Sequence, residues 1–314
     1  MMPPPAPRPE PERVPEPGQL HALRPWAFAP TDWGPCRTFI ETSPMTAPVF
    51  SPDFAALLGD PRLAGFTPED ALYLDIEATG LSHGAGTLAF LIGAARIERG
   101  QVVLEQLFLT DPTEEMAVLG RCLELLESRP YLVSFNGKSY DLSVLQARLI
   151  ITRHMSRMEA GLKLRPHLDL LHVSRHAYRG LFPDGRLQTL EREVLRLDPS
   201  VRADDVPGSL VPTLYFHYLQ TGYAPPLDVV LTHNRTDVLS MVSLTAHLCA
   251  LFDDPSPSTP APILANLGRH AMRKKLHARA ERLLTRAAAE GAPDVADDLA
   301  RVQKRIERQA KRLR

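Results

Sequence analysis

The sequence contains few cysteines, and they form no motif. Only three occur among 314 residues, Cys36, Cys122 and Cys249, and no two of them form a CxxC pair. Cysteines that are widely spaced and odd in number argue against a disulfide framework and against a thiolate zinc site. We therefore expect a protein of the reducing cytoplasm.

Long apolar runs and an excess of one charge are also missing. No segment approaches the roughly 18 apolar residues that a membrane-spanning helix requires. The chain begins MMPPPAPRPEPER, without the basic and apolar regions of a signal peptide. The formal net charge is -1, so no overall attraction to nucleic acid or to a membrane surface is expected. Binding of nucleic acid would have to depend on a local surface.

Proline, in contrast, is abundant, with 30 residues, more than half of which precede residue 70. A segment rich in proline and charge buries too little apolar surface to order itself. We therefore expect a disordered tail over 1–20, and an extended strap over 21–70 that carries both tryptophans. The main domain is then 71–252, followed by a linker over 253–262 and a helical tail over 263–314.

Strand signals are clearest at the start of the main domain. ALYLDIEATG predicts one strand, and GTLAFLIGAARIERGQVVLEQLFL predicts two more, joined by a tight Arg-Gly turn. A helix capped by Asp111 and a short strand, YLVSFNG, follow, and this order predicts that the short strand pairs with the first in parallel. The rest is mostly helical, at roughly 140–155, 167–179, 187–196, 209–221 and 227–251. This pattern predicts an α/β fold with a mixed sheet.

Two acids, Asp75 and Glu77, interrupt the first apolar strand. Because side chains alternate along a strand, both carboxylates face one side, and Leu74 and Ile76 face the other. Burying such a pair is costly and adds repulsion, unless a cation or water lies between the groups. A metal ion and an edge strand with solvent-facing acids are both consistent with the pattern.

Two further patterns place polar groups near the end of this strand. In SFNGKSYDLSVL, Asn136 ends a strand and Asp141 opens a helix, at the sheet edge where the strand carrying Asp75 also ends. In THNRTDVLSM, His233 and Asp237 are four residues apart and share a helix face. Taken singly, Asp141 is also consistent with a helix-start acid, and His233 with a surface partner of Asp237.

As an ordered set, the three patterns resemble those of the DEDD superfamily of 3′ to 5′ exonucleases, most closely its YprB-like branch. The resemblance covers about residues 70–250 and implies a ribonuclease H-like fold. The tail resembles a single tetratricopeptide-type unit in LGRHAMRKKLHARAERLLTRAA. The segments that carry the resemblance in the main domain are DIEATG (75–80), NGKSYD (136–141), HLDLLHVSRHAYR (167–179), LQTLEREVL (187–195), DDVPG (204–208) and HNRTD (233–237).

The resemblance implies a phosphodiester hydrolase that uses two divalent cations. It assigns Asp75, Glu77, Asp141 and Asp237 as ligands of Mg²⁺ or Mn²⁺, which prefer hard oxygen donors. His233 is the candidate general base, because imidazole titrates near the working pH. Better-known subfamilies have a histidine five residues or a tyrosine four residues before the last aspartate, so a histidine at the tyrosine spacing departs from the family pattern.

Other polar residues have supporting assignments. Asn136 and Lys138 are candidates for contact with the scissile phosphate or the terminal sugar, with a turn residue and an exposed lysine as the alternatives. Asp169 is expected to support a metal ligand or to be a satisfied buried acid. The basic residues of 301–314 are expected to form a solvated helix face, which could also contact phosphate.

These patterns favour a metal-dependent exonuclease that acts on single-stranded 3′ ends of nucleic acid. Two alternatives stay open: a non-catalytic scaffold of ribonuclease H-like fold, whose helical tail docks a protein partner, and a structure-selective endonuclease. All four ligand carboxylates are present, which favours an enzyme. The polarity of cleavage follows only from the resemblance, and the choice between DNA and RNA has no signature in the sequence.

Overall fold

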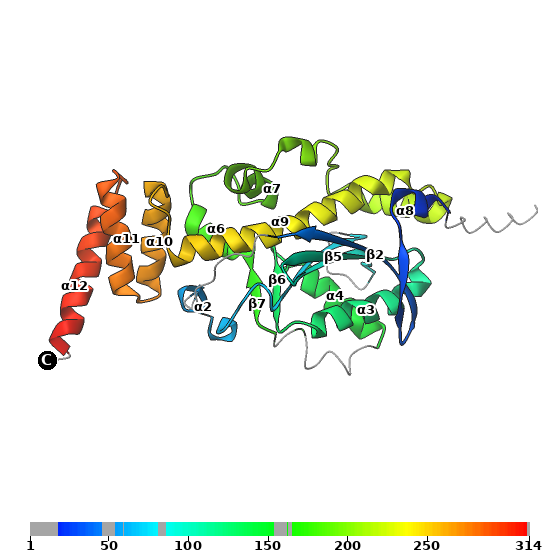
Figure 1. Cartoon of the computed structure of the whole chain (residues 1–314), viewed down its shortest axis with the longest axis horizontal. Coiled ribbons are helices and arrows are strands. Elements are labelled where there is room, and N and C mark those ends of the chain that lie inside the picture. Colours follow the sequence, from blue (N-terminus) through cyan, green and yellow to red (C-terminus); the bar gives the residue numbers. More distant parts are fainter. Residues whose placement is uncertain are drawn as a thin grey trace, which may run out of the picture.

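A seven-stranded mixed sheet lies at the centre of the protein, in a computed structural model that describes residues 18–45, 54–58, 60–80, 86–153, 162 and 165–312 (Figure 1). The strand order is β1-β2-β5-β4-β3-β6-β7. β3, β4 and β5 are antiparallel, and β6 and β7 continue the sheet in parallel, which confirms the predicted α/β fold. The strands are β1 (Ala27–Thr31), β2 (Gly34–Pro44), β3 (Ala71–Ala78), β4 (Ala89–Glu98), β5 (Gln101–Phe108), β6 (Tyr131–Ser134) and β7 (His167–Asp169).

The turn and the parallel pair that the sequence predicts are both present. Arg99 and Gly100 join β4 to β5 with φ angles of 51° and 76°, as a two-residue hairpin turn requires. β3 pairs with β6 in parallel from Ala71 to Tyr73. Because β6 then ends, the C-terminal half of β3 is open on that side to side chains from elsewhere in the chain.

The N-terminal segment differs from the extended strap that we expected. β1 and β2 form a hairpin, and β2 pairs with β5, so the segment adds two antiparallel strands to the sheet. Trp26 is buried against Phe39 and Phe108, and these apolar contacts order a segment whose proline content argued for irregular structure. α1 (Gly18–Leu23) overlaps the end of the predicted disordered tail. The rest of that tail, 1–17, lies outside the described residues.

Helices cover both faces of the sheet (Figure 1). Tyr73 belongs to the core under α6 and α9, whereas Leu72 and Leu74 belong to the core under α3 and α4. α7 continues into a π-helical turn over 191–195. The helices of this part are α2 (Phe54–Leu58), α3 (Glu115–Glu127), α4 (Asp141–Ile151), α6 (Leu170–Tyr178), α7 (Leu187–Leu190), α8 (Val211–Thr221) and α9 (Asp228–Asp253).

The predicted helix over 167–179 is wrong at its start. Residues His167–Asp169 form β7, which pairs with β6 in parallel through Leu168 and Val133. The backbone of these three residues pairs with the free edge of β6, and the helix begins only at Leu170, with α6. The short strand carries Asp169 to the same sheet edge as the ends of β3 and β6.

Three helices end the described chain: α10 (Ala261–Arg273), α11 (His277–Ala289) and α12 (Ala296–Arg312). They confirm the predicted helical hairpin and the further helix. Asn266 donates from Nδ2 to the carbonyl oxygens of Ala177 and Arg179, both at 3.0 Å, and so fixes α10 to the end of α6. In the described part of the chain, every helix is too short or too polar to cross a membrane.

Candidate active site

β3 presents Asp75 and Glu77 on the face covered by α9. They are the two half-buried positions of a strand whose other residues are all buried. Leu74 and Ile76 point the other way, into the core under α3 and α4. The alternation predicted from the sequence is thus present, and the two acids lie under a helix rather than on an open edge strand.

A close contact between α9 and β4 sets the position of Asp75. Gly93 is the partner of Asp75 in the sheet, and a Cβ at Gly93 would lie 2.3 Å from Asn234 Oδ1. The fully buried Asn234 donates from Nδ2 to Asp75 Oδ2 (2.9 Å) and accepts from Gln106 Nε2 (2.9 Å). Sequence analysis assigned no role to Asn234, although it belongs to the segment HNRTD.

Asp141 reaches β3 from the start of α4. Its Oδ1 accepts a hydrogen bond from the backbone N–H of Ile76 at 3.3 Å, beyond the point where β6 has ended. The preceding turn needs Gly137, because a Cβ there would lie 2.4 Å from Ser134 Oγ and 2.9 Å from Asp141 Oδ2. The turn therefore brings Asp141 beside the strand that carries the first two acids.

Asp169 holds this turn in place. The buried carboxylate accepts from the backbone N–H groups of Asn136 (2.8 Å), Lys138 (3.2 Å) and Leu171 (3.2 Å), so it caps α6 and fixes the segment that leads to Asp141. This arrangement matches a supporting role, which stays a prediction because it depends on the metal sites.

The two candidate substrate residues are both exposed. Asn136 has a φ of 66°, a left-handed conformation that asparagine adopts more readily than most residues. Lys138 lines a hollow with Arg62 and Arg165, and none of the four acids lines that hollow. Contact of either residue with substrate stays a prediction.

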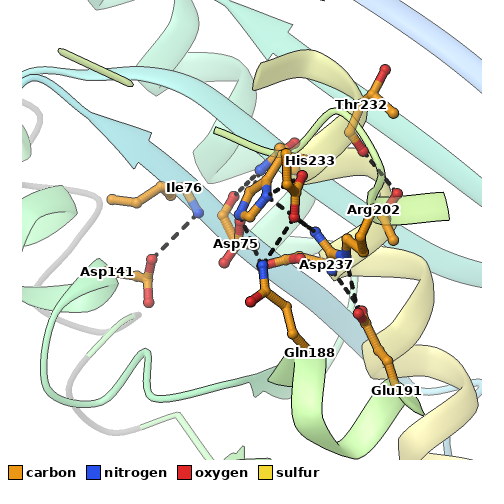
Figure 2. Close-up of polar contacts among 12 residues, drawn as sticks. Asp75, Ile76, Asp141, Gln188, Glu191, Arg202, Thr232, His233 and Asp237 are labelled. Carbon is orange, nitrogen blue, oxygen red and sulfur yellow. Dashed lines mark hydrogen bonds and ion pairs between the residues drawn. The ribbon is translucent and has the colours of Figure 1, made fainter. Parts of the chain in front are cut away.

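α9 carries the remaining predicted residues into a network of ions (Figure 2). Arg202 forms an ion pair with Asp237 and donates two hydrogen bonds to Glu191, at 2.9 and 2.6 Å. His233 Nδ1 lies 2.9 Å from Asp205 Oδ1, and its Nε2 lies 3.6 Å from Asp237 Oδ2. In Figure 2, Asp141 lies across β3 from this network.

Sequence analysis missed the ionic partners in this network. Glu191 lies in LQTLEREVL and Asp205 in DDVPG, two segments for which only a resemblance was noted. Arg202 ends a short 3₁₀ turn, Pro199–Arg202, whose N-cap is Asp198. Charged residues in an irregular segment have no periodicity, so their convergence on α9 had no signal in the sequence beyond that resemblance.

Desolvation and mutual repulsion act on the acids. Burial holds the pKa of Asp75 well above its usual range, and Asp237, Asp141 and Glu77 raise it further. Burial raises the pKa of Glu77 to about 8, against the lowering effect of His233. Burial likewise raises the pKa of Asp141 to about 7, although backbone N–H groups oppose the rise. The pKa of Asp237 is also raised by burial, against His233 and Arg202. The four carboxyls therefore form one electrostatic unit.

The His233 ring responds to the same charges. Burial alone would lower its pKa, but Asp237, Glu77 and Asp205 outweigh that effect and raise the pKa above the usual value. Nδ1 of His233 lies 2.9 Å from Asp205 Oδ1 and 3.1 Å from a guanidinium nitrogen of Arg202. A carboxylate accepts and a guanidinium donates, so these two contacts favour opposite states of Nδ1. Both contacts hold the ring with its Nε2 toward Asp237.

The four acids are suited by chemistry to a hard divalent cation. All are oxygen donors, which Mg²⁺ and Mn²⁺ prefer, and a cation would offset the repulsion that raises their pKa values. Within the described ranges, however, no group of three or more His, Cys, Asp or Glu side chains is arranged to hold a metal ion. The guanidinium of Arg202 instead neutralises Asp237, so metal binding requires Asp237 to exchange this partner.

Comparison with known proteins agrees with the fold. A family model described as RNase_H superfamily matches residues 72–249. An uncharacterised protein of Bacillus subtilis (strain 168), YprB, is 36% identical over 186 residues, which is 59% of this chain and 43% of that relative. The matched region thus spans less than half the length of the relative. The family match over residues 72–249 contains all four acids and His233.

Proposed function

Because the chain belongs to the RNase_H superfamily, we propose that it is a metal-dependent nuclease that shortens single-stranded nucleic acid from the 3′ end. The superfamily indicates nuclease-type activity and binding of nucleic acid. The observation that carries the finer proposal is the convergence of four acids, from β3, α4 and α9, at the end of β3, where burial first and then mutual repulsion raise their pKa values. The order of the three DEDD-type motifs supports the 3′ to 5′ polarity.

In this proposal, Asp75, Glu77, Asp141 and Asp237 supply oxygen ligands for two divalent cations. Such cations, when bound, activate water and offset charge on the phosphate and on the leaving oxygen. Asn234 fixes Asp75 by donating to its Oδ2, and the N–H of Ile76 orients Asp141. These hydrogen bonds hold two ligands in place before the substrate arrives.

His233 is the proposed general base. In the neutral tautomer whose Nδ1 hydrogen is donated to Asp205, Nε2 carries no hydrogen and faces the acids. A proton taken from water at Nε2 produces an imidazolium, which Asp205 and Asp237 stabilise. This role corresponds to the direction in which these charges shift the His233 pKa.

The direct test is hydrolysis of 5′-labelled single-stranded DNA and RNA in Mn²⁺, in Mg²⁺ and in EDTA. We expect a ladder of shortened products that requires the metal and is absent from Asp75→Asn. Cleavage by the wild type in EDTA, or wild-type rates in the variant, would contradict the proposal. A circular single strand separates an exonuclease from an endonuclease, because robust cutting of the circle requires no free end and indicates an endonuclease instead.

The ion pair of Arg202 with Asp237 favours a second candidate, a binding scaffold that has kept the fold without catalysis. In that case α10 and α11, which resemble one tetratricopeptide-type unit, dock a protein partner. Binding of single-stranded oligonucleotide without hydrolysis in either metal would support the scaffold. Replacing Arg202 by Gln sharpens the test: a gain of metal binding would indicate that this arginine restrains a competent site.

A further inference from the structure

A cavity of about 660 Å³ lies between α6, α7 and α10. Its volume falls within the roughly 300–1,000 Å³ range of sites that bind small ligands. Four arginines line it: Arg175 of α6, Arg179 directly after α6, and Arg269 and Arg273 of α10. None of the four acids lines it, so it is separate from the candidate active site.

Most of the positive charge in this cavity is not neutralised. Arg269 donates from Nε to Asp298 Oδ2 at 2.7 Å, so its charge is matched. In the part of the chain that the structure describes, Arg175, Arg179 and Arg273 have no carboxylate partner, and all three are exposed. One acid, Asp184, also lines the cavity. Three unmatched guanidinium groups at one concave surface favour an anionic ligand.

An aromatic ring lies in the same cavity. Phe182 is half-buried, and its ring centroid is 5.4 Å from that of Tyr178. Tyr178 is fixed by a 2.6 Å hydrogen bond between its hydroxyl and His247 Nε2. Arginine side chains and an aromatic ring together are the groups that contact the phosphates and bases of single strands.

α7 connects the cavity to the acids. Leu190 lines the cavity, and the next residue, Glu191, binds the Arg202 guanidinium that pairs with Asp237. We propose that the cavity binds a segment of single-stranded nucleic acid whose 3′ end lies at the four acids. The position of the 3′ end depends on the proposed function, whereas binding of the strand in the cavity does not.

The test is a binding measurement without catalysis, by fluorescence anisotropy of a labelled single-stranded oligonucleotide in EDTA. The variant combines Arg175→Ala, Arg179→Ala and Arg273→Ala. Its matched control removes the same charge from the exposed face of α12, with Lys304→Ala, Arg305→Ala and Arg308→Ala. We expect the cavity variant to bind about 10-fold more weakly or worse, and its salt dependence to fall by about 0.7 for each lost phosphate contact. In this proposal the basic face of α12 is solvated and makes no phosphate contact, so the control should change affinity less than about 2-fold.

A second variant keeps the charge and removes the ring. Phe182→Leu should weaken binding about 5-fold or more with an unchanged salt dependence, since a stacked base contributes about 1–3 kcal/mol. Equal losses in the cavity variant and the α12 control would contradict the proposal, and so would competition by poly-glutamate as effective as that by unlabelled oligonucleotide. Absence of binding by the wild type would also overturn it.

The two proposals fail separately. If the cavity variant binds more weakly and the wild type hydrolyses nothing, the cavity proposal stands and the nuclease proposal is rejected. If the wild type hydrolyses nucleic acid in a metal-dependent way and the cavity variant binds and cleaves as well as the wild type, only the cavity proposal is rejected. Circular dichroism and thermal unfolding of each variant confirm that it is folded, as we expect for exposed substitutions.

Discussion

Acids lie on or against both faces of this sheet, and cations match their charge to different extents on the two faces. Glu105 of β5, 0% exposed, accepts from Arg121 at 2.7 and 3.0 Å and from Arg96 at 3.3 Å. Glu115 of α3 accepts two hydrogen bonds from Arg148 at 2.5 Å. On the other side of the sheet, Arg202 pairs with Asp237, and among the described residues Asp75, Glu77 and Asp141 have no lysine or arginine as an ion-pair partner.

The difference separates structural acids from candidate functional ones. A buried carboxylate with a bidentate arginine is neutralised within the fold, and removing either partner is destabilising. At the end of β3, burial and then the neighbouring acids raise the pKa values of the carboxyls instead. In the proposed function, a divalent metal ion would stabilise their charged form.

The largest expected effect tests the acids at the end of β3. Asp75→Asn removes a charge but keeps the shape, and its oxygen can still accept from Asn234. We expect hydrolysis to fall by about 1,000-fold or more, the upper range for loss of one preorganised electrostatic contact. Unfolding of the metal-free variant in urea should require as much denaturant as the wild type, or more. A clear loss of stability would mean that Asp75 is a structural acid.

The next effect concerns the proton acceptor. His233→Ala should slow hydrolysis by about 100- to 10,000-fold, the range for loss of a general base. Asp205→Asn gives a matched comparison, because it leaves the ring but weakens its orientation, and its loss should be smaller. Rates are measured in single turnover at saturating metal. A loss below 10-fold for His233→Ala would assign proton transfer to another group.

Glu105→Gln tests the structural acids. The substitution leaves Arg96 and Arg121 without their shared carboxylate, and both arginines are partly exposed, so we expect a loss of about 2 kcal/mol of stability, below the range for fully buried pairs. Urea unfolding monitored by circular dichroism measures it. Hydrolysis by the folded fraction should stay within about 2-fold of the wild type. A large catalytic loss without a stability loss would remove the distinction between the two groups.

The smallest effect is a pH dependence of the metal-free protein. The pKa values of Asp141 and Glu77 are raised to about 7 and about 8. Burial lowers the pKa values of His167, His176, His247 and His270, which makes stability rise with pH below about 6.5. The acids are therefore tested between pH 7 and 8.5, where they still hold protons in the folded state that the unfolded state has released, so stability should fall as the pH rises. We expect a decrease of about 1 kcal/mol in EDTA over this window, and a smaller one for Asp75→Asn. Stability that rises between pH 7 and 8.5 would contradict the shifts.

The sequence predicted the parts of the fold that local patterns determine. Alternation placed Asp75 and Glu77 on one face of β3, and the Arg99-Gly100 turn marked the β4–β5 hairpin. It did not predict β1 and β2, because their order depends on Trp26 packing against Phe39 and Phe108. Nor did it predict β7, whose three residues become a strand through pairing with β6.

The same division holds in the candidate site. Spacing along β3 and α9 paired Asp75 with Glu77 and His233 with Asp237, and the resemblance of the ordered motifs added Asp141 and gave all five their candidate roles. Asn234 acts through a fully buried contact with Asp75, which requires Gly93 on a different strand. Arg202 reaches Asp237 from an irregular segment 35 residues earlier in the chain. Contacts of this kind depend on the folded chain and have no local pattern.

The most direct measurement is thermal unfolding of wild type and Asp75→Asn in EDTA and in increasing Mn²⁺ at pH 7.5. If the acids at the end of β3 bind metal, the wild type should gain about 2.7 kcal/mol of stability at a Mn²⁺ concentration 100 times the dissociation constant. Asp75→Asn should gain much less at the same concentration. Equal stabilisation of the two proteins, or none of the wild type, would contradict the assignment of these acids as metal ligands.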